Sequence, residues 1–263
     1  MISTKSGLAF LLAFSVLSFG CAPGLSAAES GPGSTENSTG DGGNKGVFDL
    51  KAQTDLYRQR YNLKNPYDKL VDNRGNGYED LYGIRNLRVV LHGIYYRGGA
   101  NNTYNKYLKR GNSNPLQDHA LDNLCKEGFT ESIYLYSTNY SSARKNTSCR
   151  NFHNEDQNLD YPQINAFSTS KEQIFLGKIF DRIRGKTRGL LYAHCWNGWH
   201  ASGLIAALSL QQFCGWSGTE AEQYWIRNTD GDSNYPDHKK RIREFKPDDK
   251  FKITPEEQAL ICP

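Results

Sequence analysis

The sequence predicts an α/β domain in which a central, mostly parallel sheet is flanked by helices. Short apolar runs such as residues 131–137 and 189–193 have the length of strands, and longer segments with apolar residues at helical spacing lie between them. Strands that alternate with helices along a chain are typical of parallel sheets covered by helices. The chain has 263 residues, 37% of them hydrophobic, which is enough for one substantial core.

The first half of the domain shows these elements in order. Residues 47–86 are rich in tyrosine and turn residues and lack clear periodicity, so we expect irregular structure with a short helix. Residues 87–99 alternate like strands around Gly93, and residues 115–128 have helical spacing. The polar segment 138–163 is too long for a simple connection, and we interpret it as a functional loop or a surface excursion.

The second half continues with a helix over residues 168–186, for which Ser170 is the expected cap. One face of this helix is expected to carry Ile174, Phe175, Ile179 and Ile183. Residues 189–193 predict a buried strand, and residues 203–213 are apolar around most of a helix, which places that helix at the centre of the core. Two or three shorter helices follow, one of them starting with the capping sequence of residues 254–260.

The charge balance excludes some classes of partner. The net charge of +4 is spread over many Lys and Arg residues with 28 acidic residues among them, so no basic block indicates nucleic-acid binding. No cluster with zinc-like spacing accompanies the histidine and cysteine residues, so we predict neither a metal site nor a cofactor.

The amino-terminal residues predict export. Residues 1–28 combine a lysine, an apolar run and small residues, as in a secretory signal. Cleavage near 20/21 would follow a lipobox-like "LSFGC" and leave a lipid anchor at Cys21, whereas cleavage near 27/28 would release a soluble form. Residues 29–46 read as a flexible polar linker and residues 47–263 as the folded domain. We therefore expect a protein of the bacterial periplasm, anchored to the membrane as a lipoprotein or secreted.

Export gives the cysteine count a meaning. Outside the cytosol, Cys125, Cys149, Cys214 and Cys262 can form two disulfides in any of three pairings, and Cys195 remains as the odd thiol. We expect at least one disulfide.

Cys195 lies in "YAHCWNGWHASG", between the buried strand and the apolar helix. When a chain turns from a strand into a helix in this way, successive backbone amides converge and form an anion cradle. The same dipoles favour a thiolate over a thiol. Gly198 would allow the tight backbone that such a turn needs.

The segment "HCWNGWHASG" resembles the signature loop of the cysteine-dependent protein tyrosine and dual-specificity phosphatases, which is His-Cys, five residues, Arg, then Ser or Thr, usually followed by Gly. The resemblance covers roughly residues 88–225 and implies the phosphatase fold. It implies that His194 supports the loop, Cys195 is the nucleophile and Ser202 steadies the thiolate. The expected ligand-binding loop consists of Trp196, Asn197, Gly198, Trp199, Ala201 and Gly203.

Two departures put ordinary catalysis in doubt. Ala201 occupies the position of the family's arginine, which forks onto two phosphate oxygens. The family's general acid is an aspartate on a loop before the cysteine, and residues 161–170 contain no aspartate; Asp156 and Asp160 lie further upstream. Both losses predict very weak phosphatase activity.

Three functions remain open at this stage. The first is a pseudophosphatase that binds an anionic ligand or a phosphorylated extracytoplasmic substrate, with Trp196 and Trp199 as stacking surfaces. The second is an enzyme that uses Cys195 as a nucleophile or redox thiol, with His200 as acid, base or anion partner. The third is an active phosphatase in which Arg97, Arg150 or His200 replaces the missing arginine.

Overall fold

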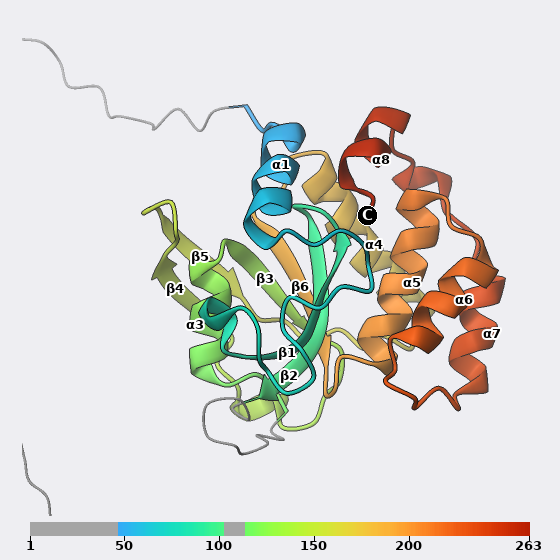
Figure 1. Cartoon of the computed structure of the whole chain (residues 1–263), viewed down its shortest axis with the longest axis horizontal. Helices are drawn as coiled ribbons and strands as arrows, with labels where there is room; N and C mark the ends of the chain where they lie inside the picture. Colours follow the sequence, from blue (N-terminus) through green and yellow to red (C-terminus); the bar gives the residue numbers. More distant parts are fainter. Residues whose placement is uncertain (1–46, 103–113) are drawn as a thin grey trace, which may run out of the picture. The chain divides into compact units, whose positions relative to one another are not determined.

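The computed structural model describes residues 47–102 and 114–263; the predictions for residues 1–28 and 29–46 lie outside these ranges. A six-stranded sheet in the order β1-β2-β6-β3-β5-β4 runs through the described part (Figure 1). Its strands are β1 Gly83–Leu91, β2 Tyr95–Asn102, β3 Phe129–Tyr134, β4 Asn146–Arg150, β5 Asp156–Asp160 and β6 Leu190–Cys195. The four inner strands are parallel, and the two edge strands, β1 and β4, pair antiparallel with their neighbours. The predicted α/β class with a mostly parallel sheet is confirmed.

Helices cover both faces of this sheet. Two of them, α1 Leu50–Tyr61 and α3 Asp118–Lys126, pack on one face. The other face carries α4 Thr169–Ile183, α5 His200–Cys214, α6 Gly218–Arg227, α7 Pro236–Glu244 and α8 Pro255–Ile261. Short 3-10 helices lie at Glu79–Leu81, Tyr140–Ser142 and Asp249–Phe251.

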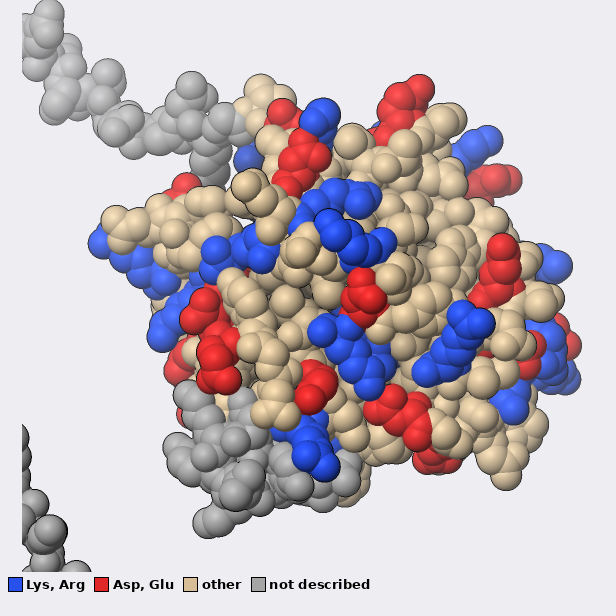
Figure 2. Space-filling model, in the orientation of Figure 1, with Lys and Arg blue, Asp and Glu red and all other residues tan. Residues whose placement is uncertain are grey.

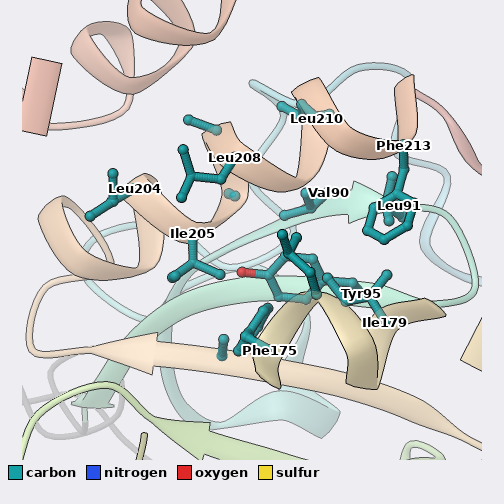
Figure 3. Close-up of a cluster of buried hydrophobic side chains, with 14 of the residues drawn as sticks. Val90, Leu91, Tyr95, Phe175, Ile179, Leu204, Ile205, Leu208, Leu210 and Phe213 are labelled. Atoms are coloured by element: carbon teal, nitrogen blue, oxygen red, sulfur yellow. The ribbon is translucent and has the colours of Figure 1, made fainter. Parts of the chain in front are cut away.

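Alternation along the strands divides the core in two. Tyr95 belongs to the cluster under α4 and α5, whereas its neighbour Tyr96 belongs to the cluster under α1 and α3, because successive strand side chains point to opposite faces. Figure 3 shows the first cluster, in which side chains of α4 and α5 meet Val90, Leu91 and Tyr95 of the sheet. Almost every residue of α5 is buried, as its apolar circumference predicts. Helix α5 starts close to the carboxyl end of β6, and its buried residues fix it in the core.

Several details differ from the sequence predictions. Residues 138–163 contain β4 and β5, which extend the sheet; of their residues only Thr147 and Leu159 are buried, so the strands lack an apolar alternation that could be recognised. Helix α4 begins at Thr169 with Ser168 at the cap position, so Ser170 as the cap was wrong. Ile174 was also misplaced, since its side chain is exposed and Leu176 is buried instead.

Two disulfides are present, Cys125–Cys149 and Cys214–Cys262, and Cys195 is a free, buried thiol. The expectation of at least one disulfide is confirmed. Disulfides persist mainly outside the reducing cytosol, so these two are compatible with an extracytoplasmic location. None of the helices in the described ranges has the length and apolar content that crossing a bilayer requires. On the face shown in Figure 2, basic and acidic side chains are interspersed.

Candidate functional site

The cysteine loop, residues 195–203, links the carboxyl end of β6 to the start of α5. Strand β6 ends at Cys195 and helix α5 begins at His200, so four residues make the turn. The strand lies between β2 and β3 in the interior of the sheet. Open parallel sheets bind ligands at the carboxyl ends of their strands, and the cysteine loop occupies such a position.

The carbonyl groups of three successive loop residues are held by groups of β1 and β2. The three hydrogen bonds run from the Ala100 N–H to the Trp196 carbonyl at 2.9 Å, from the Asn86 Nδ2 to the Asn197 carbonyl at 2.8 Å and from the Arg97 Nη1 to the Gly198 carbonyl at 2.5 Å. In a trans peptide the carbonyl and the following N–H point in opposite directions. The N–H groups of residues 197–199 are therefore directed away from β1 and β2.

The first turn of α5 adds further N–H groups to this side of the loop. Within the described ranges, no acceptor is recorded for the backbone N–H of Gly198, Trp199, His200, Ala201 or Ser202. The first N–H groups of a helix have no partner inside the helix and carry its positive partial charge. Together with the inverted peptides before it, the helix start supplies the N–H groups that an anion cradle requires.

Glycines on two elements let the loop approach the sheet. Gly198 has a φ of +74°, and a Cβ atom on it would lie 2.6 Å from the Gly98 carbonyl carbon and from the Gly99 nitrogen. A Cβ on Gly99 would lie 2.7 Å from the carbonyl carbon of Asn197. The sequence "YRGG" therefore matters for the site; it lies within β2, and glycines inside a strand indicate a close backbone approach.

The thiol of Cys195 contacts Ser202. Their Sγ and Oγ atoms are 3.4 Å apart, and both side chains are buried. Because the other cysteines of the described part are joined in disulfides, Cys195 is the thiol available at this site. A hydroxyl at this position can donate a hydrogen bond to a thiolate, as the family resemblance implies for Ser202.

His194 lies beneath the loop and is completely buried. Its Nε2 is 2.7 Å from the Tyr161 hydroxyl, and its Nδ1 is 3.2 Å from the Cys195 carbonyl. Tyr134, Tyr161 and Tyr192 stack around its ring. Burial lowers the pKa of His194 to about 3, so the imidazole is neutral at physiological pH. Its position matches the supporting role implied by the resemblance.

The buried neutral His194 predicts a loss of stability in acid. Its pKa in the folded state, about 3, lies below the ordinary value of 6.5, so its contribution is present above pH 6.5 and lost as pH falls toward 3. Between these values the free energy of unfolding falls by up to about 1.4 kcal/mol per pH unit from this group. Urea unfolding of the protein and a His194→Gln variant, compared from pH 7 to pH 4, measures it. Equal pH slopes for both chains would contradict this assignment.

Ala201 and Gly203 serve packing. The side chain of Ala201 is fully buried in the core cluster around α5. A Cβ on Gly203 would lie 3.0 Å from Cδ1 of Trp225 and 3.7 Å from Nη1 of Arg97, so this glycine makes room for both side chains. Within the loop, these two residues contribute backbone and space.

Two of the loop's ring-bearing residues, Trp199 and His200, contact the segment between α6 and α7. Trp196 is 47% exposed. The Trp199 indole donates to the Asp230 carboxylate at 3.1 Å. His200 has its Nε2 2.7 Å from the Asp232 carbonyl and its ring centroid 4.1 Å from that of Tyr235. His200 is thus engaged with residues 232–235, and no contact with the Cys195 thiol is recorded.

The candidate replacements for the missing groups lie elsewhere. Arg150 pairs in register with Asp156, the first residue of β5. Both therefore lie at the amino-terminal end of the parallel strands, whereas Cys195 lies at the carboxyl end of β6. Asp160 aligns with Glu131, which in turn aligns with Leu191, four residues before Cys195. At about 3.3 Å per strand residue, Asp160 lies more than a dozen ångströms below the thiol. Arg97 is bound on the carbonyl side of the loop, where it cannot fork onto an anion held by the amides.

No group of three or more His, Cys, Asp or Glu residues in the described ranges is placed to hold a metal ion.

Comparison with known proteins shows a likeness among solved structures. No protein-family model and no curated protein matches the chain. Among solved structures, it resembles the core catalytic domain of the PP-IP phosphatase SIW14 from S. cerevisiae, crystallised with citrate. The two share 12% sequence identity over 62% of this chain and 85% of that domain, with a TM-score of 0.37. The solved structures that this chain resembles thus include a phosphatase domain.

Proposed function

We propose that the cysteine loop binds a tetrahedral oxyanion, free or as part of a phosphorylated extracytoplasmic ligand, with little ordinary phosphatase activity. One observation carries the proposal: three successive carbonyls are held by β1 and β2, which leaves the amides of the loop and of the α5 start available to an anion. Ala201 supplies no guanidinium, and the acidic residues considered as proton donors, Asp156 and Asp160, lie far from the thiol. Binding is thus retained while two groups needed for turnover are missing.

The signal-like residues 1–28 and the two disulfides support a periplasmic or secreted location, with Cys21 as a lipid-anchor site in the lipoprotein form. Under this proposal the ligand is an extracytoplasmic molecule that carries a phosphate, sulfate or carboxylate group. The exposed Trp196 beside the cradle provides a surface on which a ring of that ligand can stack.

Anion binding without hydrolysis is the expected result for the mature domain. Trp196 and Trp199 lie in the loop, so their fluorescence should change saturably when phosphate, sulfate or tungstate is added. Hydrolysis of p-nitrophenyl phosphate should not exceed that of Cys195→Ser. Absence of saturable oxyanion binding would refute the proposal, as would rapid hydrolysis that Cys195→Ser abolishes.

A second candidate function is thiol chemistry at Cys195. The observation that favours it is the free sulfur 3.4 Å from the Ser202 hydroxyl, in a domain whose other described cysteines are oxidised. Alkylation by iodoacetamide across pH distinguishes the two functions. A Cys195 no more reactive than a free cysteine would leave only the binding role.

A further inference from the structure

Arg88 and Arg97 form a buried pair of like charges on β1 and β2, and Arg97 contacts the cysteine loop. They are opposite each other in the antiparallel register of β1 and β2. Their exposed fractions are 1% and 0%. Like charges directly opposite on neighbouring strands destabilise a sheet, and burial increases the cost.

Neither arginine has a carboxylate partner among the described residues. The ion pairs of that part include neither side chain, and Nε of Arg88 and Nη2 of Arg97 are buried without a hydrogen-bond partner. Arg182 provides the contrast, since it is equally buried but lies 2.9 Å from the Glu131 carboxylate. Arg182 thus has a carboxylate partner in the core, whereas Arg88 and Arg97 have none within ion-pair distance among the described residues.

Both arginines connect to the carbonyl side of the loop. Arg97 donates from Nη1 to the Gly198 carbonyl at 2.5 Å and from Nε to the Tyr224 hydroxyl at 2.8 Å. Arg88 donates to the carbonyl of Asn86 at 3.0 Å, and the Asn86 amide donates to the Asn197 carbonyl at 2.8 Å. One peptide group therefore separates the charge of Arg97 from the loop amides, and Arg88 is linked to the loop through Asn86. Donors on a carbonyl polarise the peptide and strengthen the hydrogen bonds that its N–H can make.

The electrostatics of the pair agree with this geometry. Burial, followed by the charge of Arg97, lowers the pKa of Arg88 to about 9. At neutral pH the guanidinium remains charged, and although the Asp230 carboxylate acts on it from a distance, no ion pair of the described part includes Arg88. An anion in the cradle would lie within the low-dielectric region around both charges and would relieve their repulsion.

We propose that Arg88 and Arg97 supply, from β1 and β2, the positive charge that the loop lacks at Ala201, and that they make the cradle select doubly charged over singly charged tetrahedral oxyanions. This inference rests on the proposed oxyanion binding. Arg97 is in addition the positioning residue that keeps the Gly198 carbonyl turned away from the ligand. The attraction of two fixed charges doubles when the ligand carries two negative charges, whereas amide hydrogen bonds respond less to that difference.

Sulfate and perchlorate provide the test because they are both tetrahedral but carry two charges and one. Their dissociation constants are measured by loop tryptophan fluorescence and calorimetry at constant ionic strength on the mature domain. We expect Arg88→Met to weaken sulfate binding about 10-fold and perchlorate binding much less, so that the ratio of affinities falls. Arg97→Lys keeps the charge but loses the guanidinium fork, so both anions should bind more weakly at an unchanged ratio.

The control and the contrary outcomes are distinct. Arg150→Gln removes one exposed charge on the edge strand β4, at the end of the strands away from Cys195, and should change neither affinity. Arg88→Met should fold with an unchanged or higher Tm, since it removes half of a buried like-charge pair. Sulfate binding with an unchanged ratio in Arg88→Met would overturn this inference alone. An intact protein that binds neither anion would instead overturn the proposed function.

Discussion

Replacing Ala201 with arginine is expected to raise Cys195-dependent hydrolysis of p-nitrophenyl phosphate by on the order of 10³-fold, because arginines that act in phosphoryl transfer contribute 10³ to 10⁵. The substrate isolates this effect, since p-nitrophenolate is a good leaving group and depends little on a proton donor. Ala201 is the second residue of α5. The methyl group of Ala201 lies in the core. The longer side chain of an arginine at this position would have to leave the core for its guanidinium to reach the bound anion.

The burial of Ala201 makes a volume control necessary. Ala201→Met carries a long apolar side chain into the same position without the charge, so it reports the cost of packing alone, about 1 to 3 kcal/mol for overpacking. Initial rates for both variants, each also combined with Cys195→Ser, are compared with unfolding midpoints. A folded Ala201→Arg protein with no gain in rate would show that the guanidinium is not what limits catalysis here. If both variants unfold, the core around α5 has closed this position to arginine.

Gly198→Ala is expected to abolish oxyanion binding and to lower the free energy of unfolding by roughly 3 kcal/mol or more. Its Cβ would overlap backbone atoms of Gly98 and Gly99 at 2.6 Å. Backbone in the middle of a sheet cannot move aside as a side chain can, so the loop must shift. The hydrogen bonds that β1 and β2 donate to the three loop carbonyls must then lengthen. The amides would then lose their common direction.

A second glycine separates overlap from backbone strain. Gly215 ends α5 with a φ of +70°, close to that of Gly198, but its nearest neighbour for a Cβ is Nε2 of Gln258 at 3.5 Å. Gly215→Ala should therefore cost only about 1 kcal/mol, the strain of alanine at positive φ, and leave binding intact. Urea unfolding and sulfate titration measure both variants. Equal losses in the two would contradict the close approach of the loop to β2.

The elements that could be predicted are those whose signal is local. The apolar circumference of residues 203–213 and the capping sequence of residues 254–260 both correspond to helices where expected. Strands β4 and β5 were missed because nearly all of their residues are polar and only one in each strand is buried, so neither shows an apolar alternation. The cysteine count predicted at least one disulfide but not which of the three pairings forms, since pairing depends on distances that only the fold sets.

By itself the sequence determined that a thiol stands at a strand-to-helix turn with a glycine at the tight position and alanine in place of the arginine, because all of these features lie within nine consecutive residues. Only the tertiary structure decided what holds that turn. The register of β1 on β2, and of β2 on β6, brings Asn86, Arg88 and Arg97 behind the loop from about a hundred residues away. Such pairing follows from the energy of the whole packed core, so no local pattern around these three residues identifies them as part of the site.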